Sequence, residues 1–342
     1  AARGGAHRPA LKGLDKPDRP GAPWPERTDG DAPGLGVVRR KLVSLLVSGL
    51  VAAVVVGPSA ASAVDTPIDP ARGARTAATT PRLVGLAAAS HAGFDRVVWT
   101  FAGGLPGRRA AYVPRLLGDA SGLPVRLAGD AVLQVTFSGA DAHDATGTST
   151  AARRLVVGLP NVIELAQSGD FEAVVTYGVG LAKAQPFHLF TLTNPSRVVL
   201  DVRKDYGQVT RTVTFADPAR FAAGTPPFTR LVRRVVPSGA QASALMNQLM
   251  AGPTNAERAR GIAVVRSGAG DFDRLRIDTV GTARLRLLGG CTSGGSTFTV
   301  ANLVFPTLKA LRTVDHVKIY DPAGRTERPL GRTDSIPSCL EP

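Results

Sequence analysis

The chain has 342 residues, of which 41 are Lys or Arg and 27 are Asp or Glu, and its formal net charge is +14. This length allows for two ordinary domains. Its two cysteines and five histidines stand apart from one another, without the paired spacing of zinc ligands. The composition therefore argues against a zinc-binding domain, and we expect neither a metal nor another cofactor.

Residues 37–63 read VVRRKLVSLLVSGLVAAVVVGPSAASA, which is the layout of a secretory signal peptide. An Arg-Arg-Lys start precedes an uncharged, mostly apolar run at 42–57, and Ala61 and Ala63 supply the small residues that signal peptidase requires. A retained membrane anchor is the alternative, but a spanning helix needs roughly 20 apolar residues. We therefore expect export, cleavage before Val64, and a mature chain that does not stay inserted in the membrane.

The segment before this signal peptide is rich in Pro and Gly. Residues 1–36 contain too few large apolar side chains to offset the chain entropy lost on folding. They are either a disordered extension or a stretch upstream of a mis-annotated start, in which case translation begins at Val37 or Val38. Residues 64–80 are small, polar and Pro-containing, which predicts a linker.

The charge of the expected mature chain favours polyanionic partners. Residues 1–63 contain nine basic and five acidic residues, so 64–342 retain 32 basic and 22 acidic ones, a net charge of +10. Nucleic acid, anionic lipid and anionic wall polymers would all attract such a chain. Export would separate the protein from nucleic acid, so we expect no nucleic-acid partner.

From residue 81 the sequence changes to short runs rich in β-branched residues, with turn signals about every ten residues. This spacing over 81–204 predicts an antiparallel β-sandwich. Asn194-Pro195-Ser196 separates two strand-like runs, so 187–203 is predicted to be a hairpin. Alternation in VVWTF places Trp99 among apolar side chains on one face, and we expect it in the core rather than on a sugar-binding surface.

Four residues in this region have polar tips that could face a glycan or an anion. These candidate ligand-binding residues are Arg96, Tyr112, Arg115 and Arg197. The sequence does not bring them together.

Five stretches carry a family resemblance: HAGFDRVVWTF, LPGRRAAYV, PVRLAGDAVLQVTFSGADAHD, LPNVIELAQSGDFEAVVTYGVGLA and PFHLFTLTNPSRVVLDV. Together they resemble the AMIN-like domain of secreted proteins from high-GC Gram-positive bacteria, over about residues 81–204. GFDRVV and TNPSRVVLDV are the most specific parts. The resemblance implies a β-sandwich that targets a protein to the cell envelope, in some members by binding peptidoglycan.

Residues 205–230 contain several Pro and Gly residues and are predicted to be a linker. Beyond it the apolar period becomes helical, with Ser238 as the expected N-cap and Gly252-Pro253 as the stop. The first helical face consists of Ala242, Leu245, Met246, Leu249 and Met250, and we expect both methionines in the core. A second face, interrupted by Pro306, consists of Val300, Leu303, Val304, Leu308 and Leu311.

Four stretches of the second half carry another family resemblance: ALMNQLMAGPTNAE, GGCTSGGSTFTVANLVFPTLKAL, VDHVKIYDPAGRTERPLGR and DSIPSCLEP. They resemble the GerMN domain of spore-germination and sporulation proteins, over about 231–342. The resemblance implies an α+β domain in which two helices pack on a mainly antiparallel sheet, and it implies no catalytic residues. GerMN domains also occur in envelope proteins of non-sporulating bacteria, so germination, sporulation and general envelope maintenance all remain open.

No motif in the chain predicts catalysis. GGCTSGGS lacks the Lys of a phosphate-binding loop, and no Gly-x-Ser-x-Gly nucleophile motif occurs. His143 lies between Asp141 and Asp144 in a polar loop, which we interpret as a solvated turn. Asp271 and Asp273 lack the downstream acidic residues of a calcium loop.

Cys291 and Cys339 are the only cysteines in the chain. An even number of cysteines in an exported protein predicts one disulfide bond between them. We expect this bond to attach the C-terminal DSIPSCLEP segment to the loop that precedes the second helix.

Together these features predict a secreted, non-enzymatic, cell wall-associated protein that binds peptidoglycan or an associated anionic wall polymer. The alternative is a protein-interaction module whose partner is another envelope protein. Sedimentation with insoluble wall, compared with capture from a membrane extract, would separate the two.

Overall fold

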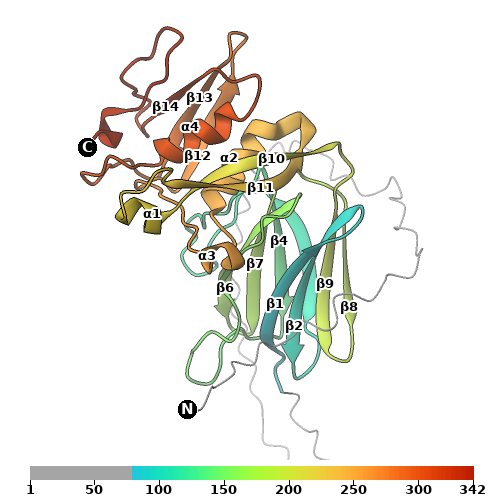
Figure 1. The fold of residues 1–342 in the computed structure, drawn as a ribbon. Coiled ribbons are helices and arrows are strands. Elements are labelled where there is room, and N and C mark those ends of the chain that lie inside the picture. The colour runs from blue at the N-terminus through green and yellow to red at the C-terminus, as the bar shows by residue number, and fades with distance from the viewer. Residues whose placement is uncertain (1–78) are drawn as a thin grey trace, which may run out of the picture. The chain divides into compact units, whose positions relative to one another are not determined.

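The computed structural model describes residues 79–342 (Figure 1). Several sequence predictions lie outside this range: the segment 1–36, the signal peptide 37–63 with Ala61, Ala63 and Val64, and the linker 64–80 as far as residue 78. Within the described range, every helix is too short or too polar to cross a membrane.

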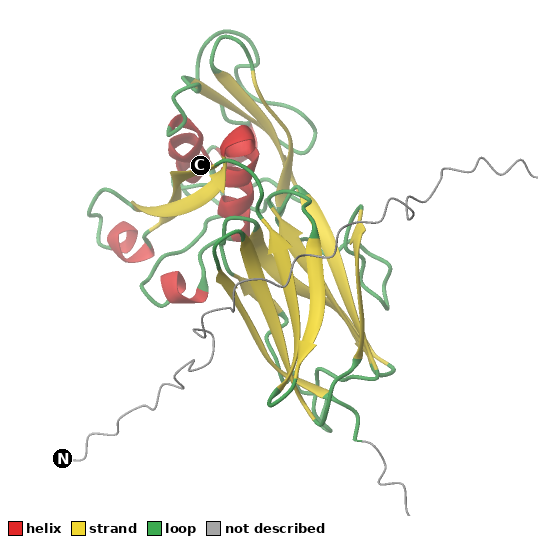
Figure 2. Ribbon diagram, turned by 90° about the vertical axis from the view of Figure 1, so that its right-hand side faces the viewer, coloured by secondary structure: helices red, strands yellow, loops and turns green. Residues whose placement is uncertain are grey.

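Residues 81–204 form a β-sandwich of two antiparallel sheets, as the sequence predicted (Figures 1 and 2). The first sheet has the order β1-β2-β9-β8, with β1 Arg82–Ser90, β2 Phe94–Ala102, β8 Phe187–Leu192 and β9 Ser196–Arg203. The second has the order β3-β4-β7-β6-β5, with β3 Gly107–Val113, β4 Ala131–Ser138, β5 Arg154–Val156, β6 Val162–Phe171 and β7 Val174–Leu181. The predicted hairpin at 187–203 is confirmed as β8 and β9.

Aromatic side chains fill the space between the two sheets. Trp99 on β2 is fully buried, and its ring lies 5.3 Å from that of Phe137 on β4 and 6.3 Å from that of Tyr177 on β7. Both contacts are edge-to-face, which favours aromatic pairs beyond the burial of their area. The expectation that Trp99 is a core residue is confirmed, and its indole does not form a sugar-binding surface.

A loop of the sandwich covers the outer face of the second sheet. Gly178 and Gly180 on β7 leave room for it, because a Cβ at Gly178 would lie 2.5 Å from a methyl group of Leu116 and one at Gly180 would lie 2.0 Å from the carbonyl oxygen of Ala128. The glycines of TYGVGL therefore allow the segment 114–128 to pack on this sheet. Polar and aromatic side chains of the strands gather instead on the outer face of the first sheet.

Residues 205–342 form a second module with its own apolar core. Its strands are β10 Gln208–Ala216, β11 Thr229–Pro237, β12 Asp271–Ile277, β13 Thr282–Leu288 and β14 His316–Tyr320. Its helices are α1 Pro218–Ala222, α2 Gln241–Ala251, α3 Asn255–Arg258 and α4 Ala301–Lys309, with short 3-10 turns at Ser238–Ala240 and Ser338–Leu340. All helices of the described chain lie in this module (Figure 2).

The range 205–230, predicted as a linker, is part of this second module. Strand β10 pairs along its whole length with β11, from Gln208 opposite Pro237 to Ala216 opposite Thr229. Val213 and Phe215 point into the core and are fully buried. The Pro and Gly residues that suggested a linker lie after β10, around α1, so the second module begins near residue 205 instead of 231.

Helix α2 confirms the predicted apolar face but begins differently. Ser238 opens a 3-10 turn and does not cap the helix, which starts at Gln241 and ends at Ala251. The next residue, Gly252, stops the helix with a φ of 91°. Every residue from Ala244 to Ala251 is buried, including Met246 and Met250 as expected. The helix is buried on all sides because it contacts β10, β11 and α4 of its own module and also β6 of the sandwich.

The second helix and the sheet agree in part with the prediction. Val300, Leu303, Val304, Leu308 and Leu311 are buried as predicted, and Pro306 lies inside helix α4. Strands β12 and β13 are antiparallel, whereas β13 and β14 are parallel. The parallel pair arises because α4 forms the crossover between these two strands, a connection that parallel pairing requires.

The C-terminal end of α2 joins the two modules. Arg126 from the sandwich donates to the carbonyl oxygen of Met250, and Arg266 donates to the same oxygen at 2.8 Å and to that of Ala251 at 3.2 Å. The last carbonyls of a helix lack intrahelical partners and carry partial negative charge, so guanidinium groups satisfy and stabilise them. Around this point a small apolar cluster joins Ala251 to Ile163 of β6.

Further polar contacts surround the same joint. Asp130 of the sandwich accepts hydrogen bonds of 2.7 Å from both Ser243 and Asn247 of α2. The side-chain amide of Gln248 donates to the carbonyl oxygen of Leu159 at 3.1 Å. Sandwich and second module are therefore connected by satisfied polar groups as well as by apolar contact, which no linker between independent domains would provide.

The predicted disulfide bond is confirmed. Cys291 and Cys339 are bonded, with their Cα atoms 5.7 Å apart. The backbone N–H of Ser293 donates to the carbonyl oxygen of Cys339 at 2.7 Å, and Leu340 beside it is buried. The glycine-rich loop thus presents Cys291 to the C-terminal segment, which is the structural role expected for it.

Candidate functional site

The outer face of the first sheet carries the most ordered arrangement of the candidate ligand-binding residues. Arg96 on β2 lies opposite Asp201 on β9, and its Nε and Nη2 donate to the two carboxylate oxygens at 2.7 and 2.8 Å. Its guanidinium carbon lies 5.1 Å from the ring centroid of Phe94 and 5.6 Å from that of Phe190. The bidentate pair and the two ring contacts fix the guanidinium plane on this face.

Arg197 lies on the same face as Arg96. It pairs in register with Thr100 of β2 and with Leu192 of β8. Since Thr100 is four residues from Arg96 on one strand, both side chains project from the same side of the sheet. The structure therefore places Arg96 and Arg197 on one surface with Phe94 and Phe190.

Tyr112 and Arg115 lie elsewhere. The Tyr112 hydroxyl donates to the carbonyl oxygen of Gln185 at 2.5 Å and accepts from its N–H at 2.8 Å, while the ring contacts that of Phe187 edge-to-face at 5.8 Å. Burial raises the pKa of this tyrosine. Tyr112 thus closes the edge between β3 and β8. Arg115 is exposed in the loop after β3, so neither residue joins the Arg96 surface.

The residue before Arg96 has a structural role that explains the GFDRVV motif. Asp95 is fully buried and accepts hydrogen bonds from Ser90 Oγ at 2.7 Å and from the backbone N–H groups of Asn161 and Val162 at 2.7 and 3.0 Å. Lys204, with 8% of its side chain exposed, lies 3.2 Å away. The carboxylate ties the first sheet to the start of β6 in the second.

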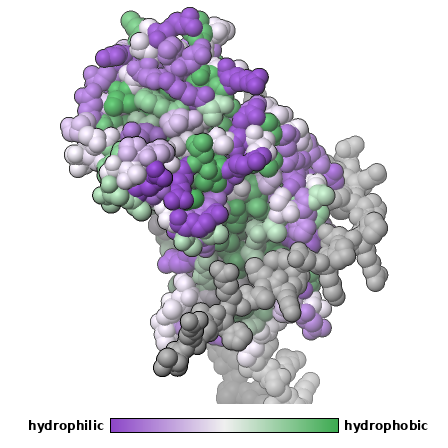
Figure 3. Space-filling view, viewed as in Figure 1, coloured by the Kyte–Doolittle hydropathy of each residue, from purple (hydrophilic) through white to green (hydrophobic). Residues whose placement is uncertain are grey.

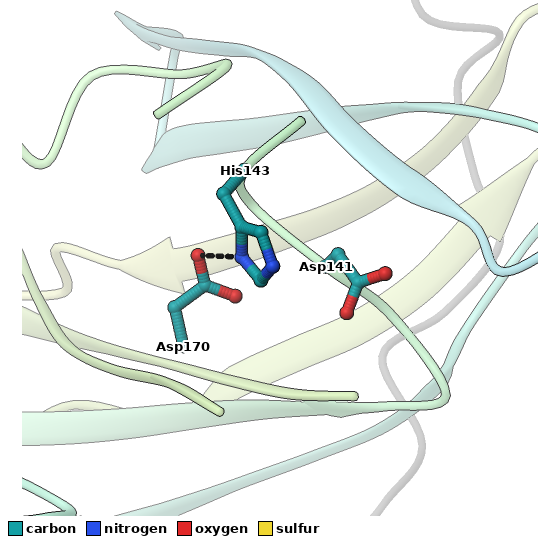
Figure 4. A group of neighbouring side chains, drawn as sticks. All are labelled: Asp141, His143 and Asp170. Atoms are coloured by element: carbon teal, nitrogen blue, oxygen red, sulfur yellow. Dashed lines mark hydrogen bonds and ion pairs between the residues drawn. The ribbon is translucent and has the colours of Figure 1, made fainter. Parts of the chain in front are cut away.

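A second cluster lies at the end of the sandwich where β4 and β6 meet the loop 139–150. Figure 4 shows the His143 ring between the carboxylates of Asp141 and Asp170. Its Nδ1 lies 2.8 Å from an oxygen of Asp170, whose other oxygen accepts from the backbone N–H of Ala142 at 3.0 Å. The hydrogen bond and charge of Asp170 raise the pKa of His143. The interpretation of this stretch as a solvated turn missed Asp170, which is distant in sequence.

This cluster has the donor types of a cation site but the geometry of an ion pair. The ligand atoms of Asp141, His143 and Asp170 lie within 4.8 Å of one another. Zinc–nitrogen and zinc–oxygen bonds are about 2.0–2.2 Å long, so two ligands of one ion lie about 3 Å or more apart. The 2.8 Å distance from His143 to Asp170 is that of a direct hydrogen bond, and the arrangement suits a proton-linked contact.

Several residues of these surfaces were not identified from the sequence. Asp201 and Phe190 could have been found from alternation. SRVVLDV places Asp201 on the same face as Arg197, and FHLFTL places Phe190 on the face opposite the apolar Phe187 and Leu189. Asp95 carried no such signal, because a carboxylate between Phe and Arg is typical of a surface residue. Only the approach of β6, about 66 residues later, makes it a buried acceptor.

The fold and these surfaces define a β-sandwich module joined to an α+β module, with an arginine–aromatic face on the sandwich. Comparison with protein families identifies the sandwich: residues 81–204 match the AMIN-like domain. The chain therefore contains an AMIN-like domain over the range that its sequence suggested. AMIN-like domains belong to cell-envelope proteins, often ones associated with peptidoglycan. Neither a curated protein nor a solved structure matches the chain, and the GerMN resemblance of 231–342 stays a prediction.

Proposed function

We propose that the protein is an exported, non-enzymatic component of the cell envelope that binds peptidoglycan or an associated anionic wall polymer through its AMIN-like domain. The observation that carries this proposal is the match of 81–204 to that domain. The arginine–aromatic face of the first sheet supports it. The basic character of the chain, +14 overall, is compatible with an anionic polymer.

The chemistry of the face suits a wall polymer. Guanidinium groups form bidentate hydrogen bonds with carboxylates and phosphates, which peptide stems and wall polymers supply. Phe94 and Phe190 offer ring surface for the apolar faces of sugars. Because Arg96 is already held by Asp201, we assign it to shaping the surface and assign direct contact with an anion to Arg197.

Sedimentation with purified sacculi tests the proposal with matched variants of the full chain. We expect Arg197→Gln to reduce binding several-fold at low salt, because it removes a cation from the face. Arg115→Gln, which removes an equal charge from the loop after β3, should leave binding unchanged. Equal loss in both variants would point to non-specific charge attraction, and a wild-type protein that stays in the supernatant would refute wall binding and favour a protein partner in the envelope.

The salt dependence separates two modes of binding. Exposed charge contacts are weak and screened, and the Debye length is only about 3 Å at 1 M salt. Binding that survives high salt would indicate aromatic contact with a glycan. A link to sporulation or germination rests on the GerMN resemblance alone, and comparison of a deletion strain during growth and sporulation would test it.

A further inference from the structure

The second module contains an open cavity of about 650 Å³ that is lined by cations. Its walls come from β10, the start of α2, β12 and the segment that follows α4. Arg211, Arg276 and Arg312 lie in these walls, and no Asp or Glu does. Such a one-sided lining attracts anions, and low-dielectric walls strengthen the attraction.

A second cavity of about 550 Å³ adjoins the first on the outer face of the β12-β13-β14 sheet. Arg276 lines both cavities, and Arg274, Arg284 and Arg286 line the second with Tyr320. In Figure 3 hydrophilic side chains gather over the part of the molecule that contains these strands. The linings of the two cavities share Leu275 and Arg276, and we call the two together the basic groove.

The sheet register places three cationic residues directly opposite one another, and two of them, Arg276 and Arg284, line this groove. Arg276 on β12 pairs with Arg284 on β13, which pairs in turn with Lys318 on β14. Like charges at opposed positions destabilise a sheet. Lys318 is buried, which lowers its pKa, and its ammonium donates to the carbonyl oxygen of Leu330 at 3.1 Å. The opposed pair of Arg276 and Arg284 therefore places two like charges in the groove, an arrangement that strand pairing does not favour.

Acidic residues neutralise only part of this charge. Asp278 lies 3.1 Å from Arg284, and Asp273 pairs with Arg286. In the described part of the chain, no ion pair involves the remaining guanidinium groups, which are those of Arg211, Arg274, Arg276 and Arg312. Arg211 donates to the side-chain oxygen of Gln241 at 2.8 Å, a neutral acceptor that leaves its charge uncompensated.

The start of α2 adds to the positive potential. The 3-10 turn and first turn of the helix, 238–243, line the first cavity, and no side chain caps the helix. The N-terminal end of a helix carries partial positive charge and N–H groups without intrahelical partners. This contribution reinforces the arginines, which carry the inference.

We propose that the basic groove binds a linear phosphate-bearing polymer without nucleobases, with successive phosphates in the two cavities and Arg276 between them. Planar guanidinium groups match phosphate oxygens in a bidentate manner. Single-stranded nucleic acid is bound by stacking its bases on aromatic side chains, and Tyr320 is the one aromatic residue that lines the groove. The groove therefore gives the protein a second binding site, which is separate from the arginine–aromatic face of the AMIN-like domain.

Binding of the full chain to inorganic polyphosphate, measured by titration calorimetry, tests this proposal. We expect Arg276→Gln to weaken binding about tenfold, because it removes charge-assisted hydrogen bonds in both cavities. Arg312→Gln should weaken it less, since Arg312 lines one cavity. The control is Arg260→Gln, an equal change of charge at an exposed residue of the same module that lines neither cavity.

The outcomes distinguish binding in the groove from non-specific attraction of polyphosphate to a basic protein. Equal affinities of Arg276→Gln and Arg260→Gln would overturn the proposal, as would orthophosphate binding as tightly as the polymer. Oligothymidylate of equal charge binding as tightly as polyphosphate would refute a base-free ligand. The difference in polyphosphate affinity between Arg276→Gln and Arg260→Gln should be the same with and without Arg197→Gln, because Arg197 lines neither cavity. Failure of the groove and failure of the arginine–aromatic face to bind sacculi are therefore separate results. The four substituted residues, Arg197, Arg260, Arg276 and Arg312, are at least partly exposed. Thermal melting of each variant checks that it folds.

Discussion

Replacing the buried carboxylate of Asp95 by an amide should destabilise the sandwich severely. Asp95→Asn keeps the shape of the side chain but leaves the Lys204 ammonium, 8% exposed, without its charge partner. Removing one partner of a buried ion pair costs about 3–5 kcal/mol. We expect the lower end, about 3 kcal/mol, because Ser90 also accepts from Lys204. This is a large part of the roughly 5–15 kcal/mol that stabilises an ordinary domain.

Urea unfolding followed by fluorescence measures this loss. Trp24 and Trp99 are the two tryptophans of the chain, so a Trp24→Phe background leaves buried Trp99 as the reporter. Adding Lys204→Met to Asp95→Asn removes the uncompensated charge and should recover about half of the lost stability.

The control is Asp205→Asn, the same chemical change in an exposed pair. Asp205 is 44% exposed and Arg203 is 35% exposed, so the cost should stay below about 1 kcal/mol. If Asp95→Asn costs no more than Asp205→Asn, or if Lys204→Met in the same chain brings no recovery, Asp95 does not stabilise the sandwich through its charge.

Three further predictions concern other parts of the chain. Reduction of the bond between Cys291 and Cys339, which are 48 positions apart, should lower the free energy of unfolding by about 4 kcal/mol, measured by urea titration with and without reductant; an unchanged midpoint would contradict this. Because Asp170 raises the pKa of His143 above 6.5, their contact stabilises the fold below that pH and is lost as pH rises through the folded-state pKa. The urea midpoint of the wild type should therefore exceed that of His143→Gln at about pH 5.5, and the gap should close by about pH 9; a constant gap would refute the linkage. Intact-mass analysis of secreted protein should show a chain that starts at Val64, whereas a membrane form with residues 42–57 would contradict cleavage.

Local patterns were sufficient to predict the sandwich and the two main helices. Alternation predicted that Trp99 lies in the core, and the helical period identified the buried side of α2, because each pattern depends on residues close in sequence. The boundary at 205–230 failed for a related reason. Pro and Gly around α1 dominated the composition, although QVTRTVTFA just before them has the β-branched alternation of strand β10.

The candidate sites were harder to predict because they depend on distant residues. Arg96 and Arg197 share a face through the register of β2 and β9, which a single strand does not specify. Tyr112 meets Gln185 only when the sandwich closes. The basic groove combines arginines from β10, β12 and the segment after α4, each of which alone is typical of an ordinary solvated position.

The arginine contacts at the end of α2 have a consequence for where the chain can be cut to give a stable fragment. A fragment that stops at residue 204 matches the AMIN-like domain but loses Ala251, which packs near Ile163, and the partners of Asp130. The apolar surface that α2 covers would then be exposed to solvent, and Asp130 would lose its partners. Exposed apolar surface favours aggregation of the fragment. The match to the AMIN-like domain ends at residue 204, but we expect the cooperative folding unit to continue beyond it. A single calorimetric transition for 79–342 would be its signature.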